Sequence, residues 1–86
     1  MKKIICKIRP FTYKQVVMVY QNNECILTTS CTLSDFSDDI LVLVDKYNIN
    51  QIDLIGANLI TSKIKKDIEK RNTEFYSNKK LNISLY

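Results

Sequence analysis

The chain has 86 residues, 45% of them hydrophobic and 26% charged, with a formal net charge of +4. This length suits a single domain spanning residues 1–86, because two separate cores would each bury too little surface to offset chain entropy, and the composition is that of a globular rather than a disordered protein. No apolar run approaches the ~20 residues of a membrane span, and Lys7 and Arg9 interrupt the first one before it could form a signal-peptide core. We therefore expect a soluble, cytoplasmic protein, located in the host cytoplasm if a phage encodes it.

The amino-terminal region has the alternating pattern of a half-buried strand. Between residues 3 and 9, Ile4, Cys6 and Ile8 share one face, while the other face is mostly charged. Proline cannot donate a hydrogen bond to a neighbouring strand, so we expect Pro10 to end this strand.

A hairpin is predicted next. Two β-branched and aromatic runs, residues 14–21 and 24–30, flank Asn22-Asn23, and asparagine tolerates the positive φ that a two-residue hairpin turn requires. Both faces of this hairpin are largely apolar. The expected cross-strand pairs are Tyr20 with Cys25, Val19 with Ile26, Met18 with Leu27, Val17 with Thr28 and Val16 with Thr29.

Two helices are predicted after the hairpin. Residues 33–47 carry a continuous apolar stripe at three- and four-residue steps, and either Thr32 or Ser34 can cap its start. Residues 58–71 carry a narrower stripe, and Asn58 is the expected cap of this second helix.

Short apolar strands at residues 51–55 and 81–85 complete the order β-β-β-α-β-α-β. The predicted fold is therefore α/β (α+β), with a mixed five-stranded sheet in which right-handed crossovers extend an antiparallel meander and helices cover the sheet. This order matches, as a topology, the opening elements of the ribonuclease H-like and actin-like folds. A shared topology does not by itself imply a function.

The residue content argues against catalysis. Histidine, the commonest general base and neutral metal ligand, is absent, and a single glycine cannot form the usual phosphate-binding loops. Asp53 is a candidate metal ligand, but the pattern favours a structural role, either as a polar residue near a strand edge or as the partner of a lysine. Cys6, Cys25 and Cys31 form no C-x-x-C pair and are expected to be reduced thiols; the first two fall on positions expected to face the core, and Cys31 is the one to test with a thiol reagent. We predict no enzyme activity, no cofactor and no metal.

Gly56, Ala57 and Asn58 are a candidate anion-binding site. They join a predicted parallel strand to a predicted helix, and open α/β sheets usually hold ligands in such a crevice, where free backbone N–H groups meet an anion. The simpler interpretation is that Gly56 permits the turn and Asn58 caps the helix.

A basic face is predicted on the second helix, where Lys63, Lys66 and Lys70 share one side. These lysines could contact phosphates or an acidic protein. The alternative is a merely solvated helix face, which the intervening Asp67 and Glu69 favour.

An apolar interface is the third candidate surface, formed by Val17, Val19, Ile26 and Val42. Two helices are few for covering both faces of five strands. We therefore expect part of this surface to be buried by self-association, as a homodimer or higher oligomer, or by a partner protein.

These observations predict a non-enzymatic binding protein that inhibits or sequesters a host component, either a defence protein or another host protein, or a small anionic nucleotide. The abundance of residues with AT-rich codons indicates an AT-rich genome, such as that of a low-GC bacterium or one of its phages, and we expect an accessory factor of a phage or mobile element. The alternative is a small basic nucleic-acid-binding protein, whose contacts would be Lys63, Lys66 and Lys70 together with Lys2, Lys3, Lys79 and Lys80.

Overall fold

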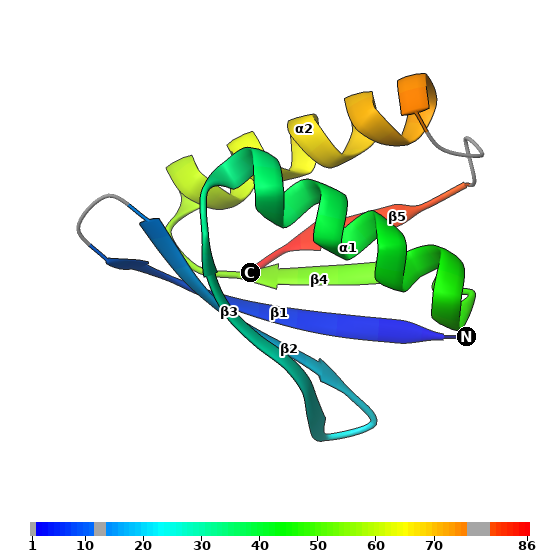
Figure 1. Ribbon diagram of the computed structural model, residues 1–86, viewed down its shortest axis with the longest axis horizontal. Coiled ribbons are helices and arrows are strands. Elements are labelled where there is room, and N and C mark those ends of the chain that lie inside the picture. The colour runs from blue at the N-terminus through cyan, green and yellow to red at the C-terminus, as the bar shows by residue number, and fades with distance from the viewer. Residues whose placement is uncertain (1, 12–13, 76–79) are drawn as a thin grey trace.

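The strands and helices occur in the predicted order in the computed structural model, which describes residues 2–11, 14–75 and 80–86 (Figure 1). The elements are β1 (Lys3–Phe11), β2 (Lys14–Gln21), β3 (Glu24–Cys31), α1 (Leu33–Tyr47), β4 (Gln51–Ile55), α2 (Asn58–Phe75) and β5 (Asn82–Leu85). No helix in the described part of the chain is long and apolar enough to cross a membrane.

The five strands form one mixed sheet in the order β3-β2-β1-β4-β5. The first three strands pair antiparallel, whereas β4 is parallel to both β1 and β5. The predicted mixed five-stranded sheet is confirmed. Its two crossovers, from β3 through α1 to β4 and from β4 through α2 to β5, both advance across the sheet in the same direction. Right-handed crossovers that advance in the same direction place their helices on the same face.

The prediction that Pro10 ends the first strand is wrong. β1 continues to Phe11, and Pro10 lies opposite Gln15 in the pairing with β2. β4 pairs only with the segment from Lys3 to Lys7. At Pro10 one side of β1 therefore has no neighbouring strand, and proline is tolerated at such an edge position.

The hairpin between β2 and β3 has the predicted two-residue turn but a different register. Asn22 and Asn23 have φ values of 53° and 65°, as a primed turn requires. Tyr20 lies opposite Cys25 as expected. The register shifts at an irregularity between Val19 and Tyr20, so that each β2 residue that precedes Tyr20 in the chain faces a residue one position further along β3 than predicted. The observed pairs are Val19 with Leu27, Met18 with Thr28 and Val17 with Thr29.

Helix α1 has the predicted bounds and caps. Thr32 is the N-cap: its side chain accepts a hydrogen bond from the backbone N–H of Asp35, and its hydroxyl lies 3.0 Å from Asp35 Oδ2. Asn48, in the left-handed conformation with φ 56°, ends the helix and donates its backbone N–H to the Val44 carbonyl. These contacts satisfy backbone groups that a helix end leaves unpaired.

Helix α2 starts and ends differently from the prediction. The backbone N–H groups of Ile60 and Thr61 both donate to the Ala57 carbonyl at 3.0 Å, so Ala57 rather than Asn58 holds the N-cap position. The helix continues to Phe75, four residues past the predicted end. Asn72, expected in a loop, is buried on the inner side of this last part, with 7% exposure.

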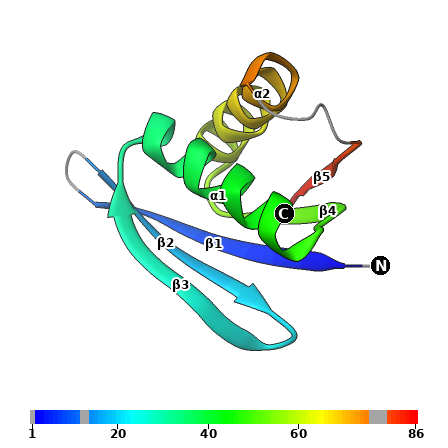
Figure 2. The same ribbon diagram turned by 45° about the vertical axis from the view of Figure 1, so that its right-hand side comes forward.

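The core lies between one face of the sheet and both helices (Figure 2). Ile4, Cys6 and Ile8 of β1 point into it, and Val17 and Val19 lie opposite Ile8 and Cys6 and share their face. The prediction that Val17 and Val19 belong to an interface is therefore wrong, since both are fully buried. The other buried core residues are Phe36, Ile40, Leu41, Val44, Ile49, Ile52, Leu54, Ile64, Ile68 and Ile83.

Candidate functional site

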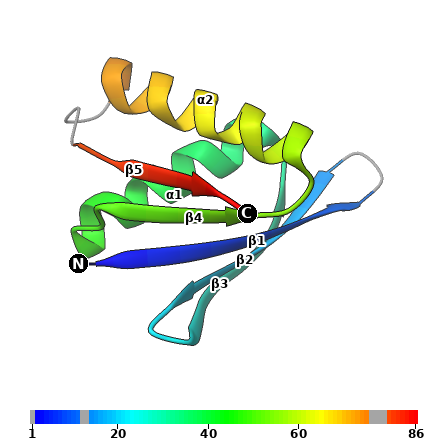
Figure 3. The ribbon, with the colours of Figure 1, turned by 180° about the vertical axis from the view of Figure 1, so that it is seen from behind.

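The second face of the sheet carries no helix, and Figure 3 shows it with α1 behind the strands. Side chains alternate between the two faces of a strand, so the residues between the core positions point to this side. We call it the helix-free face and define it by Lys3, Ile5, Lys7 and Arg9 of β1, Val16, Met18 and Tyr20 of β2, and Gln51, Asp53 and Ile55 of β4.

The centre of the helix-free face is partly apolar. Ile5 lies opposite Tyr20 and Lys7 opposite Met18 in the β1–β2 ladder. Ile5, Met18 and Tyr20 are half-buried, and Ile55 is 37% exposed. No helix covers these side chains, so their remaining apolar surface faces solvent.

Exposed cations of β1 lie beside this apolar centre. Lys7 and Arg9 are exposed, and the Lys7 Nζ atom lies 5.0 Å from the centroid of the Tyr20 ring, within cation–π distance. The Tyr20 hydroxyl lies 3.7 Å from the Met18 sulfur. Arg9 forms no ion pair with any residue that the structure describes. The face is therefore positively charged at Lys7 and Arg9.

Asp53 is the acidic residue that the strand register places on this face, and its charge is compensated locally. Lys3 Nζ lies 3.5 Å from Asp53 Oδ2, and the Gln51 side-chain amide donates to Asp53 Oδ1 at 2.8 Å and to Ser84 Oγ at 3.0 Å. The predicted pairing of Asp53 with a lysine is confirmed. Across the described residues, no three metal-ligating side chains come together.

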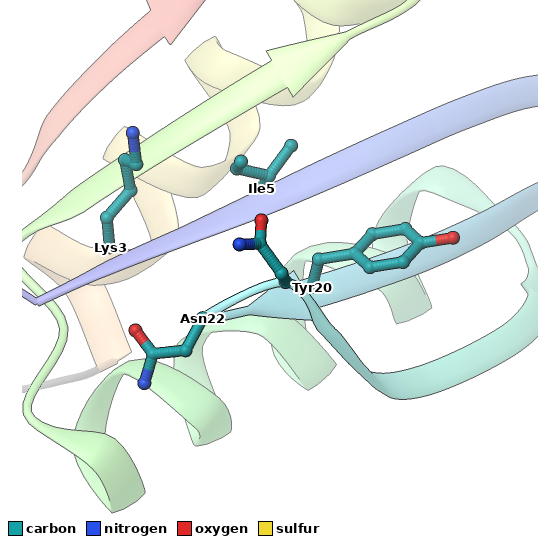
Figure 4. Close-up of a pocket in the computed structure, with 5 residues that line it drawn as sticks. Lys3, Ile5, Tyr20 and Asn22 are labelled. Atoms are coloured by element: carbon teal, nitrogen blue, oxygen red, sulfur yellow. The ribbon is translucent and has the colours of Figure 1, made fainter.

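A small hollow of about 210 Å³ opens at the turn end of the helix-free face (Figure 4). Its lining is Lys3, Ile5, Tyr20, Asn22 and Asn23. Its volume is below the roughly 300–1,000 Å³ of typical small-molecule sites. The hollow is thus a local feature of a larger surface, lying between Lys3 and Ile5 of β1 and the hairpin turn.

The predicted anion site at Gly56, Ala57 and Asn58 has a structural explanation. A Cβ atom on Gly56 would lie 2.9 Å from the carbonyl oxygen of Ile8, so glycine is needed where β4 leaves the sheet beside β1. The Ala57 carbonyl accepts the first hydrogen bonds of α2, and the Thr61 hydroxyl lies 3.3 Å from the carbonyls of Ala57 and Asn58.

The predicted basic face on α2 is exposed but interrupted. Lys63, Lys66 and Lys70 point to solvent, and Lys70 lies beside a hollow of about 190 Å³ that is also lined by Asp67 and Glu74. The neighbouring Arg71 forms ion pairs with a carboxylate on each helix. Its Nε lies 3.1 Å from Asp67 Oδ2 and its Nη1 lies 3.1 Å from Asp38 Oδ1 on α1, and the hydrogen bond with Asp67 is the main cause that raises the Arg71 pKa.

The cysteines differ from one another. Cys6 is fully buried, and this burial, with a contribution from the charge of Asp53, raises the pKa of its thiol to about 12. Cys25 is exposed, with its sulfur 3.3 Å from the Thr28 hydroxyl. The prediction that Cys25 faces the core is wrong, because its partner Tyr20 points to the helix-free face. The side chain of Cys31, like Lys79, lies outside the described residues.

Two of the predicted interface residues do reach the surface. Val42 is 55% exposed on the outer side of α1, while Ile26 is half-buried and packs against the core. They do not form one patch with the helix-free face, since Val42 lies on the helix side of the molecule. Sequence reasoning missed the grouping of Lys7, Arg9 and Tyr20, although the alternation in β1 and the direction of the crossovers are signals for it.

Comparison with known proteins supports the fold and nothing further. No protein-family model matches the chain, and no curated protein matches its sequence. A crystal structure from Bacteroides thetaiotaomicron VPI-5482, described as a protein with an actin-like ATPase fold and unknown function, is similar over 99% of this chain, with a TM-score of 0.58 and 12% identity. The chain spans 32% of that protein. The likeness agrees with the actin-like topology that the element order predicted.

Proposed function

We propose that this protein is a non-enzymatic binding protein and that the helix-free face is its recognition surface. The supporting observation is that both helices pack on one side of the sheet, which leaves Ile5, Met18 and Tyr20 without a covering layer. Tyrosine, methionine and arginine are enriched at protein interfaces, and an apolar centre with a charged rim is the usual anatomy of such a surface.

The partner that we propose is a component of a bacterial host, which the protein would inhibit or sequester in the cytoplasm. A protein partner fits better than a small nucleotide, because the hollow at Lys3 and Tyr20 is small and open onto a broad surface. Masking a partner's surface requires no catalytic group, and a rigid sheet face loses little conformational freedom on binding.

The proposal is tested by capture from a lysate of a low-GC bacterium with three immobilised baits. The first is the natural chain, the second is Lys7→Glu/Arg9→Glu on the helix-free face, and the third is Lys63→Glu/Lys66→Glu on α2. Each double variant reverses two charges, so both have a net charge of 0 instead of +4. We expect a protein that the natural chain and the α2 variant retain and the face variant loses. Retention of nothing specific, or equal retention by all three, would overturn the proposal.

Binding of single-stranded nucleic acid is a second candidate function. It is favoured by the position of Lys7, whose Nζ lies 5.0 Å from the centroid of the Tyr20 ring. Proteins that bind single strands combine a cationic surface with aromatic rings on which bases stack. This places the candidate contact on the sheet rather than on α2. Only one aromatic side chain is described on the helix-free face, so we rank this candidate below a protein partner.

A further inference from the structure

A second charged surface lies along the outer side of α1. Asp35, Asp39, Val42 and Asp45 are all exposed, and their three- and four-residue spacing places them on one side of the helix. We call these four residues the outer α1 stripe. The exposed Lys46, four residues after Val42, lies on the same side, with its Nζ 5.3 Å from the centroid of the Tyr47 ring. Asp39 and Asp45 take part in no ion pair within the described residues, so their charges are available to an external partner.

The outer α1 stripe and the helix-free face are complementary. The stripe has three carboxylates around Val42, which is 55% exposed, and these outnumber Lys46, the cation on that side of α1. The face has Lys7 and Arg9 beside Met18 and Tyr20. Two stacked helix-free faces would bring like charges together, and so would two stacked stripes. A stripe on a face instead pairs carboxylates with cations around an apolar centre, which is the arrangement that favours association.

We propose, resting on the proposed function of the helix-free face, that a second copy of this chain docks its outer α1 stripe there. Helix α1 packs against the opposite side of the sheet, so one molecule cannot join its own two surfaces. Each contact between two copies leaves one face and one stripe free. Such a head-to-tail contact builds a ring or an open chain of molecules instead of closing as a two-fold dimer.

The test measures the weight-average mass of pure protein by sedimentation equilibrium, from micromolar to millimolar concentration. We expect the mass to rise above the 10.1 kDa of one chain with no plateau at the dimer. It should fall back toward that value in about 1 M salt, where the Debye length is about 3 Å. The control Lys63→Glu/Lys66→Glu should behave like the natural chain.

Charge reversal identifies the two surfaces. Lys7→Glu/Arg9→Glu alone and Asp39→Lys/Asp45→Lys alone should each remain at 10.1 kDa, whereas an equimolar mixture of the two should associate, because each reversed surface then meets its opposite. If a reversal prevents folding, as judged by circular dichroism, the neutral pairs Lys7→Gln/Arg9→Gln and Asp39→Asn/Asp45→Asn replace it and should weaken association.

Three results would overturn this inference: a natural chain that stays monomeric at every concentration, single variants that associate as the natural chain does, or a mixture that stays monomeric. Its failure is distinguishable from failure of the proposed function. Loss of lysate capture by the face variant without self-association would reject the second copy and retain the helix-free face as a recognition surface. If Lys7→Glu/Arg9→Glu associates as the natural chain does and also captures the same lysate protein, both this inference and the proposed function are rejected.

Discussion

Gly56 lies directly against the backbone of Ile8, so that a Cβ atom at position 56 would stand 2.9 Å from the Ile8 carbonyl oxygen. The same atom would lie 3.4 Å from the Ile8 Cβ and 3.4 Å from the Thr61 Cγ2. This close approach occurs where β4 ends and α2 begins, and it holds the crossover against β1. Glycine is therefore required at position 56 because a side chain would clash with the Ile8 backbone. A left-handed conformation is not the reason, since the φ of Gly56 is not positive.

Gly56→Ala is expected to lower the free energy of unfolding by about 1–3 kcal/mol, the usual range for an added methyl group in a tightly packed position. A backbone carbonyl cannot rotate away as a side chain can, so either β1 or the start of α2 must shift. Urea titration followed by circular dichroism measures the effect. Asn58→Ala is the matched control and should change stability by less than about 0.5 kcal/mol, because Asn58 is not the cap. A neutral Gly56→Ala would contradict this account of the turn.

Much of the fold could be predicted from local patterns. The apolar stripe of α1 and its limits at Thr32 and Asn48 follow from periodicity and capping, which are properties of neighbouring residues. The register of β3 could not be predicted, because it shifts at an irregularity between Val19 and Tyr20 that neither the turn residues nor the alternation within each strand specifies. The end of α2 was missed for a similar reason, since Asn72 is polar yet buried by tertiary contacts.

The candidate site was harder to predict than the fold. Both faces of β2 are apolar, so the sequence pattern does not show whether Val17 and Val19 or Met18 and Tyr20 face the core. Burial on one side depends on where the two helices lie, which alternation within a single strand does not specify. The pairing of β1 with β2 then brings Lys7 and Tyr20 together, and they are far apart in the chain.

The three thiols allow a chemical test of which strand positions face the core. In Cys25→Ser/Cys31→Ser, the remaining Cys6 should react with a disulfide reagent at least about 100-fold more slowly than a small thiol, because reaction requires opening of the core. In Cys6→Ala/Cys31→Ser, the exposed Cys25 should react at nearly the rate of a small thiol. Rapid modification of Cys6 in the folded protein would show that β1 is turned over in the sheet.

The raised pKa of Cys6 also predicts how stability depends on pH. The thiol has an ordinary pKa of 9.0, and burial, with a smaller contribution from Asp53, raises it to about 12 in the folded chain. Well below pH 9 the thiol is protonated in both states and has no effect on stability. Between these values only the unfolded chain releases the proton, so the free energy of unfolding falls as pH rises, by about 1.4 kcal/mol at pH 10.

Cys6→Ala isolates this contribution from the titration of lysines and tyrosines. Urea titrations of both proteins from pH 8 to pH 10 should show that the stability advantage of the natural chain over Cys6→Ala shrinks by about 1.4 kcal/mol. An advantage that stays constant or grows over this range would mean that the thiol is not shielded from water in the folded state.

Binding of single strands would be revealed by its salt dependence. Fluorescence anisotropy with a labelled oligothymidylate at ~50 mM salt gives the most favourable condition, because phosphate contacts release counterions. If the helix-free face binds single strands, Lys7→Glu/Arg9→Glu should weaken binding and reduce the slope of log affinity against log salt by about 1.4, at about 0.7 for each lost phosphate contact, and Tyr20→Ala should weaken it through lost stacking. Lys63→Glu/Lys66→Glu should have less effect than the face variant. The reverse order would return the contact to α2, and no binding at this salt would exclude nucleic acid as the ligand of either surface.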